Sequence, residues 1–494
     1  MVDHEFPKDT KISSEGYLEK QLVILGIASL QGSDNYIVTR DIVQDKRCKK
    51  SYSLEIIPLW ALQGGFRMNW KELQAKMTGY RRDLHSFPEA GWTEFRTSSK
   101  ISDILHGLGF QVLLGPEIIE LSSVMGRQEA VIPSHQERAL EQGASRKWIE
   151  RMNGLTGVVG ILDTGRSGPT VSMRFDIDAV EVTEGAEISH RPFREGFSSR
   201  NRGVMHSCGH DGHTAIGLGL AELLAERKDG LAGKFKLVFQ PAEEGVRGSK
   251  AITDSGILDD SDFFITLHLG MGIPTGTLIG GSQGFLCTKK LDVHYQGRSA
   301  HAGAAPDEGH NALLAAASAV LNLHAIAPHK KGISRINVGV LTAGEGRNVI
   351  APNADMKIEV RGESQEITDY MYQRALKIIE ANAEMYEVES RIERMGESIT
   401  ARSDESLVEE VCQAGRSLGF FERIESYNGF GGSDDAAWMM KRVQDKGGRS
   451  TYIILGSDIP AGHHNEFFDF DETVLVWGVR LIFETLRRIG CKTL

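Results

Sequence analysis

The sequence predicts an α/β protein with a mostly parallel sheet, interrupted by a smaller ferredoxin-like α+β domain. From about Thr156, short β-rich runs such as "TVSMRFDID" and "DFFITLHLG" alternate with helical stretches such as "TAIGLGLAELLAERK". This alternation is typical of a domain built around a largely parallel sheet. Between residues 287 and 399 the order of elements becomes β-α-β-β-α-β, which is that of a ferredoxin-like unit. The α/β pattern resumes afterwards, so the smaller domain is expected to be an insertion.

Each expected element has its own pattern. The strands of the main sheet are short β-rich runs that end in polar residues: "GVVGILD", "TVSMRFDID", "KFKLVFQPAEE", "DFFITLHLG" and "STYIILGS". In the inserted domain "KKLDVHYQG" alternates as a strand does, and "NALLAAASAVLNLHAI" is a strongly apolar helix. Strands at "RINVGVLTAG", "ADMKIEVRG" and "VESRIERMG" and a helix at "EITDYMYQRALKIIEANAEMY" complete that unit.

The chain is expected to divide into four parts. Residues 1–67 contain strand-like pieces, "NYIVTRDIV" and "SLEIIPLWAL", but no cluster of chemically active residues. They are interpreted as an N-terminal extension of unclear role, and Met68 could be the true start because good helical patterning begins there. A catalytic domain follows in two parts, residues 68–286 and 400–494, separated by a lid or dimerisation domain over residues 287–399.

Composition excludes several classes of function. The 494 residues are 40% hydrophobic and 25% charged, as in an ordinary globular protein, and the formal net charge is −11. No basic field would hold nucleic acid or acidic lipid, so neither partner is expected. Five scattered cysteines indicate a reducing compartment. The apolar run "LVILGIASL" is too short to span a membrane and follows no basic signal start, which predicts a cytoplasmic protein.

Metal-ligating residue types recur in four separated segments. In an α/β sheet, polar residues beyond the carboxyl ends of the strands meet at one edge, and Asp176, Asp178 and Glu243 stand at such positions. Thiolate, imidazole and carboxylate are the ligands that bind zinc, manganese and similar ions. The candidate ligands are Cys208, His210, Glu244, His268 and His464. Gly209 would let Cys208 and His210 turn toward one ion just before a helix, and a bridging ligand would hold a pair of ions.

Other readings of these residues stay open. A single histidine on an apolar strand is usually a core residue, "HH" at 463–464 could be a surface turn, and "EE" is commonly solvated charge. Cys208 could instead be a nucleophile activated by His210, but the two are close in sequence, no orienting group is evident, and the other ligands would be unexplained. Glu243, beside Glu244, is the natural general base, which takes a proton from water and passes it to the leaving amine. Together these roles favour amide hydrolysis.

The motifs resemble those of the M20 family of metal-dependent amidohydrolases and peptidases. The matching segments, in chain order, are "MRFDIDAV", "HSCGHDGHT", "FQPAEEG", "GRSAHAGAAPDEGHNAL", "GRNVIAP" and "HHNEFFDFDE", and the resemblance covers residues from about 75 to the end. They are most similar to the cysteine-containing subset, which includes hippurate and auxin-conjugate hydrolases. The resemblance implies two divalent ions per subunit, Mn²⁺ or Zn²⁺, bridged by Cys208. His210 and Glu244 would complete one ion and His268 and His464 the other.

The resemblance also implies roles for residues beyond the ligands. Asp178 would orient a metal ligand, and His301 would reach the partner subunit's active site and stabilise the oxyanion. Asn348 and Arg361 would hold the substrate's carboxylate. From the sequence alone, His301 could lie in a surface turn and Arg361 in a structural salt bridge. Residues 1–67 have no counterpart in the family that can be placed.

Within this subset, the closer resemblance is carried by "RRDLHSFPEAGWTEFRT", "QERALEQGASRKWIERMNGLTG" and "AGHHNEFFDFDE". It implies hydrolysis of a small-molecule amide, p-aminobenzoyl-glutamate, to p-aminobenzoate and glutamate. It implies a homodimer or a heteromer with a related B-type subunit. Two rival hypotheses remain: a broader N-acyl-amino-acid amidohydrolase, and a non-catalytic subunit that binds a partner through the apolar helix near residues 311–326.

Overall fold

The protein is described by a computed structural model over residues 22–29, 35–42, 52–58 and 69–492. The chain forms two compact units, Met1–Trp70 and Lys71–Leu494. In the first unit, strands β1 (Leu22–Ser29), β2 (Asn35–Ile42) and β3 (Tyr52–Pro58) form an antiparallel sheet in that order. Both strand-like pieces expected there are therefore strands, β2 and β3, while Met68 lies outside the described residues.

The second unit is built on an eight-stranded sheet with the order β14-β9-β15-β8-β6-β7-β5-β4. Strands β7, β6, β8 and β15 run parallel in its centre, so their carboxyl ends share one edge. Antiparallel pairs join β5 to β7, β4 to β5 and β9 to β15. The bounds are β4 Gln111–Leu114, β5 Val158–Asp163, β6 Thr170–Asp176, β7 Lys234–Gln240, β8 Phe263–Leu269, β9 Thr277–Gln283, β14 Arg423–Gly429 and β15 Arg449–Leu455. The prediction of a mostly parallel sheet is confirmed.

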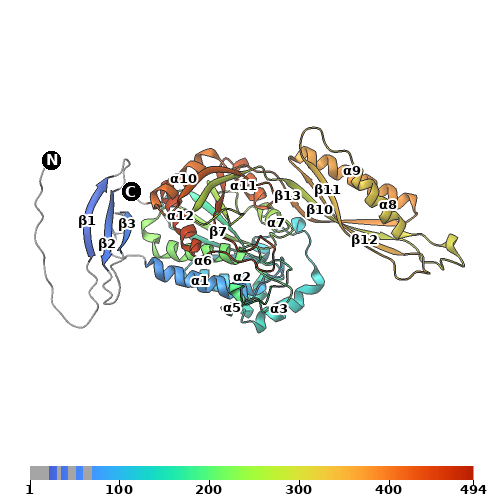
Figure 1. Ribbon diagram of the computed structural model, residues 1–494, viewed down its shortest axis with the longest axis horizontal. Helices are drawn as coiled ribbons and strands as arrows, with labels where there is room; N and C mark the ends of the chain where they lie inside the picture. Colours follow the sequence, from blue (N-terminus) through green and yellow to red (C-terminus); the bar gives the residue numbers. More distant parts are fainter. Residues whose placement is uncertain (1–21, 30–34, 43–51, 59–68, 493–494) are drawn as a thin grey trace, which may run out of the picture. The chain divides into compact units, whose positions relative to one another are not determined.

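The central strands are buried on both faces because helices cover the sheet from both sides (Figure 1). Helices α6, α10 and α12 pack together in one layer. Helix α11 packs against β8 and β15, and α7 packs against α11. The helices are α1 Trp70–Ser86, α2 Phe95–Gly107, α3 Ile132–Glu141, α4 Arg146–Met152, α5 Arg191–Arg194, α6 His210–Glu226, α7 Ser249–Asp254, α10 Glu405–Leu418, α11 Ala436–Asp445 and α12 Val474–Arg488. Burial on both faces explains the nearly continuous apolar runs of these strands.

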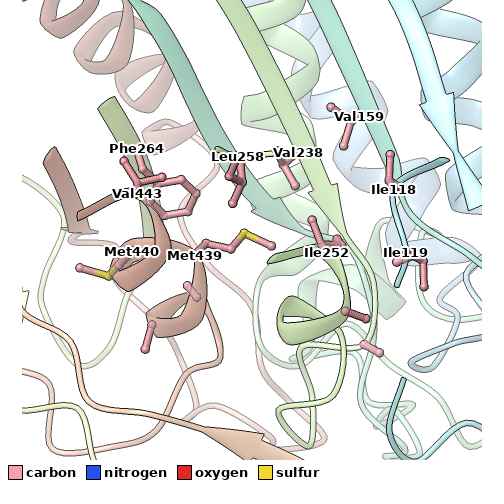
Figure 2. Packing of buried hydrophobic residues seen from close by; sticks show 14 of the residues in the cluster. Ile118, Ile119, Val159, Val238, Ile252, Leu258, Phe264, Met439, Met440 and Val443 are labelled. Atoms are coloured by element: carbon pink, nitrogen blue, oxygen red, sulfur yellow. The ribbon is translucent and has the colours of Figure 1, made fainter. Parts of the chain in front are cut away.

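Close packing fixes α6 on the sheet. Phe175 of β6 and Phe239 of β7 lie directly under Gly217, where a β-carbon would come within 2.7 Å of both rings. A larger residue at Gly217 would therefore push the helix off the sheet. On the α11 side, Figure 2 shows Met439, Met440 and Val443 beside Phe264, in a core cluster that extends to β5 and β7. These contacts hold rigid the edge of the sheet that carries the candidate site.

The inserted domain is a four-stranded antiparallel sheet with two helices on one face. Its elements are β10 Cys287–Gln296, α8 Ala312–His324, β11 Ser334–Ala343, β12 Asn353–Gly362, α9 Gln365–Met385 and β13 Glu389–Ser398. The strand order β11-β12-β10-β13 is that of a ferredoxin-like fold. Along β10, Leu291, Val293 and Tyr295 are buried under the helices, while Lys290 and Asp292 lie on the open face. The predicted β-α-β-β-α-β order is therefore confirmed.

Among the described residues, no helix is both long and apolar enough to cross a membrane.

Candidate metal and active site

The strand ends bring together the ligand types that are separated in the sequence. β6 ends at Asp176, β7 leads into Glu243 and Glu244, and β8 carries His268 one residue before its end. Helix α6 begins at His210, directly after Gly209, whose φ of 89° lies in the left-handed region that favours glycine. This turn presents Cys208 and His210 at the same edge.

Ligand atoms of the cluster lie within 4.8 Å of one another in overlapping groups. Cys208 belongs to two of them, one with His210 and His268 and the other with Glu244 and His464. His210 also groups with Glu243 and Glu244. His210 and His268 belong to the same group of ligand atoms, whereas the family resemblance assigns them to different ions. Which ligands hold which ion therefore stays a prediction. All five predicted ligands nevertheless converge on one site.

The two buried histidines are oriented as metal ligands usually are. His210 donates from Nδ1 to the backbone oxygen of Asp178 at 2.9 Å, and His268 donates from Nδ1 to the backbone oxygen of Leu269 at 2.9 Å. The lone pair of each neutral ring is then on Nε2. The Nε2 of His268 lies 3.6 Å from the sulfur of Cys208. The Nε2 of His210 is buried and has no hydrogen-bond partner among the described residues.

The charge distribution around His210 attracts a cation. Burial alone would lower the pKa of His210, but the negative charge of Asp176 helps to raise it well above its usual value. Burial raises the pKa of the Cys208 thiol, and the charge of Glu244 adds to that rise. A thiol of this kind stays protonated unless a cation is nearby, which argues against Cys208 as a free nucleophile. The donor set and the unpartnered nitrogen therefore fit a bound metal.

Asp178 supports two of the candidate ligands at once. Its backbone oxygen accepts from His210, and its Oδ2 accepts from the backbone N–H of Glu244 at 2.9 Å. The turn that carries Glu243 and Glu244 begins with Ala242, whose φ of 51° is unusual for a residue with a β-carbon. The carboxylate of Glu94 accepts from the backbone N–H of Ala242 at 2.7 Å and so helps to hold this turn.

Glu243 lies beside the cluster in an environment that favours proton uptake. Its carboxylate is 4.0 Å from the Nε2 of His210, and its side chain is 12% exposed, so water can reach it. Burial raises the pKa of Glu243 well above its usual range, and the charges of Asp434 and Glu244 contribute to that rise. A carboxyl group with a raised pKa accepts a proton more readily, as a general base must.

The two histidines of "HH" have different surroundings. His464 has a left-handed φ of 64°, and its Nε2 lies 3.2 Å from Oε1 of Glu244. The nearby carboxylate of Glu244 raises the pKa of His464, whereas the positive charge of Lys290 opposes that rise. His463 instead accepts from the backbone N–H of Met271 at 3.1 Å.

The three predicted residues of the lid are not part of this cluster. His301 is exposed, and its Nδ1 accepts from the backbone N–H groups of Gly303 and Ala304. Asn348 is also exposed, and its backbone oxygen accepts from Ala302. Arg361 contacts Glu359 at 2.8 Å on the open face of the lid. No hydrogen bond or ion pair between described residues joins these three side chains to the cluster.

A buried charge network behind the cluster was not foreseen from the sequence. Arg174 contacts Asp176 at 2.8 Å, and both Asp434 and Asp435 at 3.4 Å. His213 donates to Asp176 and accepts from the backbone N–H of Leu269 at 3.0 Å. The charged residues are visible in the sequence, Arg174 in "MRFDID" and the two aspartates in "SDD". Neither motif indicates that these residues, which are far apart in the sequence, contact one another in the fold.

A second buried network anchors the first turn of α6. Asp211, next to His210, accepts from Arg81 at 2.9 Å and from His85 at 2.8 Å. The other nitrogen of His85 lies 3.0 Å from Glu184, which also contacts His190 at 2.8 Å. Burial alone would raise the pKa of Glu184, but the hydrogen bonds from His190 and His85 outweigh it and lower the pKa to about 2.

Replacing Glu184 with glutamine is expected to make the free energy of unfolding depend less on pH at acid pH. A carboxylate whose pKa falls on folding stabilises the protein above its unfolded pKa, and that stability is lost as the pH falls toward the folded value. The window is therefore from about pH 4.5 down to about 2. Across this pH window, the free energy of unfolding of the wild type should fall by roughly 3 kcal/mol more than that of the variant. Urea unfolding at several pH values measures this difference.

The matched control is Glu187→Gln, because Glu187 is an exposed carboxylate of the same loop. This control should follow the wild-type curve. An E184Q protein with the same acid limb as the wild type would contradict the role given to Glu184.

A cleft of about 600 Å³ adjoins the cluster, a volume within the usual range for small-molecule sites. Glu244, Arg247 and Glu181 line one side of it. The lid contributes residues from the open face of its sheet, including Lys290 of β10 and Lys357 of β12. A ligand in this cleft would contact both the cluster and the lid.

The site thus combines sulfur, nitrogen and carboxylate donors with an adjoining cleft, at the carboxyl edge of an α/β sheet that carries a ferredoxin-like insertion. These features fit a metal-dependent hydrolase. The sequence model of peptidase family M20/M25/M40 matches residues 173–488 of the chain. The chain therefore belongs to this family. It is thus a hydrolase of amide bonds.

Relatives with high identity cover most of the chain. It is 48% identical to one of the subunits of p-aminobenzoyl-glutamate hydrolase from Escherichia coli (strain K12), over 84% of this chain and 95% of that protein. It is 46% identical to indole-3-acetyl-aspartic acid hydrolase of Enterobacter agglomerans, over 83% and 95%. A crystal structure of an aminobenzoyl-glutamate utilization protein from Klebsiella pneumoniae is 40% identical, with a TM-score of 0.72, and the match covers 85% of this chain and 96% of that one.

Proposed function

We propose that the protein hydrolyses the amide bond of p-aminobenzoyl-glutamate to give p-aminobenzoate and glutamate. The observation that carries the proposal is that Cys208, His210, Glu244, His268 and His464 come together in overlapping groups of ligand atoms beside Glu243. The relatives support the substrate, because two of them are named for amides that join an aromatic acid to an acidic amino acid. This reaction would be a salvage step in folate breakdown.

The five ligands would hold two divalent ions, with Cys208 shared between them. The mixed sulfur, nitrogen and oxygen donors suit zinc, while the relationship to p-aminobenzoyl-glutamate hydrolase favours manganese. When bound, the ions would acidify water and polarise the carbonyl group of the scissile bond. Asp178 would fix the orientation of His210, whose Nδ1 it already accepts from.

Glu243 would be the general base and then the general acid. Its carboxylate would take a proton from the attacking water and pass it to the leaving amine nitrogen. His301 would stabilise the oxyanion in the active site of a partner subunit, which agrees with its exposure on the lid. Asn348 and Arg361 would bind the α-carboxylate of the amino acid.

The parts of the chain would divide this work. Residues 68–286 and 400–494 would form the catalytic domain, and residues 287–399 the lid and dimerisation domain, with residues 1–67 as an extension of unclear role. The assembly would be a homodimer or a heteromer with a B-type subunit in the cytoplasm. The name of the Escherichia coli relative, which designates it as one subunit of its enzyme, supports the second form.

The direct test is release of p-aminobenzoate from p-aminobenzoyl-glutamate by the purified chain, with added Mn²⁺ or Zn²⁺ and with a chelator. Release that depends on the metal would support the reaction and show that no second subunit is needed. If protein with bound metal gives no release, the assay is repeated in the presence of the B-type subunit. Inactivity there as well would contradict the proposal.

A broader activity on amides of aromatic acids is the second candidate. The relative named for indole-3-acetyl-aspartate favours it, because that compound differs in both the acyl group and the amino acid. The ratio of rates on p-aminobenzoyl-glutamate, indole-3-acetyl-aspartate and benzoyl-glycine separates the two. Comparable rates on all three would favour the broader amidohydrolase.

A further inference from the structure

The open face of the lid sheet presents a set of charged residues to the cleft. Cross-strand partners lie on the same face of a sheet, and the register places Lys290 opposite Glu359 and Asp292 opposite Lys357. Lys290, Asp292, Lys357 and Glu359 all line the cleft. The substrate would therefore meet a wall in which positive and negative charges alternate.

Two arginines in or near the cleft already have partners. Arg247 donates to the backbone oxygens of Glu244 and Gly126, at 2.8 and 3.3 Å. Arg361 contacts Glu359, which also accepts from Thr288 at 3.4 Å. The ammonium groups of Lys290 and Lys357 make no ion pair or hydrogen bond with another described residue, but Lys357 is exposed and lies opposite Asp292, where its positive charge acts on that carboxyl group. A partly buried ammonium without a carboxylate partner, at the wall of a ligand-sized cleft, is open to a ligand.

The position of Lys290 joins the lid to the candidate site. Glu244, a proposed ligand, lines the same cleft, and Lys290 is near enough to His464 for its charge to act on that histidine. Its neighbour Lys289 points to the other side of the strand, where it contacts Asp369 at 2.9 Å and is largely buried. Only the outward lysine of this pair can therefore meet a substrate.

We propose that Lys290 binds the side-chain carboxylate of the acidic amino acid in the substrate and so selects amides of dicarboxylic amino acids. The inference rests on the proposed function, and it assigns the part of the substrate that the ligand cluster and Glu243 do not recognise. A flexible lysine side chain can follow carboxylates at different depths, which suits both a glutamate and a shorter aspartate.

The spacing on the sheet supports this assignment. Arg361 follows Glu359 by two residues along β12, so Lys290 and Arg361 are diagonal neighbours on the same face. Such neighbours have α-carbons about 7–8 Å apart, within reach of two long side chains that converge on one ligand. The contact of Arg361 with Glu359 uses its Nη2 atom, and its remaining N–H groups are proposed to hold the α-carboxylate. Two cations at this separation match a ligand that carries two carboxylates.

The test compares p-aminobenzoyl-glutamate with p-aminobenzoyl-glutamine, which has nearly the same shape but a neutral side chain. The full-length wild type, Lys290→Met, Lys290→Arg and Lys357→Met are assayed with Mn²⁺, and with the B-type subunit if activity requires it. Lys357 is the matched control, because it lies on the same face and lines the same cleft. The measured quantity is the ratio of kcat/KM values for the two substrates.

The wild type should prefer the glutamate substrate by about 10- to 100-fold, the usual contribution of a hydrogen bond to a charged group. K290M should reduce that preference to within about threefold, mainly through KM, K290R should restore part of it, and K357M should keep it. An equal loss on both substrates in K290M, or no preference in the wild type, would overturn the inference but leave the proposed function intact. Turnover of neither substrate by the metal-loaded wild type would refute the proposed function, and the inference with it.

Discussion

Replacing Glu243 with glutamine is expected to lower kcat by about 10³-fold or more while metal content stays unchanged. Removing a general base typically costs 10²- to 10⁴-fold, and here the same carboxylate would also return the proton to the leaving amine. Glutamine keeps the size of the side chain but cannot take up a proton. Steady-state kinetics on p-aminobenzoyl-glutamate, together with elemental analysis of the protein, measure both quantities.

The control for this variant is Glu181→Gln, because Glu181 is an exposed carboxylate that lines the same cleft. It should retain wild-type kcat to within about threefold. If the E243Q protein kept its activity in the assembled enzyme, the assignment of the base would be wrong. The hypothesis of a non-catalytic subunit that binds a partner through α8 would then gain support.

Replacing Cys208 with alanine is expected to remove bound metal and to lower kcat by more than about 100-fold. Mutation of a residue that only supports a metal ligand typically costs 10- to 100-fold in metal affinity or activity. Cys208 is itself a candidate ligand and belongs to two of the ligand groups. The metal-to-protein ratio should fall from about two in the wild type to one or fewer. Elemental analysis after gel filtration, with parallel kinetics, checks this.

Cys412→Ala serves as the control, because Cys412 is a buried cysteine of α10 that lies outside the ligand groups. Its metal content and kcat should match those of the wild type. If Cys208 were instead a nucleophile activated by His210, as in a thiol amidase, the pattern would differ. Activity would then survive a chelator and would be lost only when Cys208 is replaced or alkylated. That combination would rule out the metal site as the source of activity.

Much of the fold could be predicted because its central strands are buried on both faces and read as short apolar runs. Strands β9 and β14 are different. β9 carries Gly280 and Gly281 where α10 packs closely, and a β-carbon at Gly280 would come within 2.5 Å of the sulfur of Cys412. β14 is an edge strand with a half-exposed, polar sequence. Neither has the periodicity that identifies a strand from local sequence.

The candidate ligands could be predicted because each is carried by a local motif at the end of a buried strand. The networks behind them could not, because their members come together only through the topology of the sheet. Arg174 is a core position in an apolar strand, and Asp434 and Asp435 look like solvated charge. The positions of His301, Asn348 and Arg361 relative to a substrate depend on the lid and on a partner subunit, which local patterns do not encode.

The strand order has a consequence for how the polypeptide acquires its shape during synthesis. β15, near the end of the chain, lies between β8 and β9 and separates strands that were made long before it. The four lid strands are contiguous in sequence, so that domain can fold as soon as it leaves the ribosome. The main sheet cannot form completely until β15, which lies within about the last 50 residues, has been synthesised. Nascent chains are therefore expected to carry a folded lid on an unfinished catalytic domain, and they should depend on chaperones in that interval.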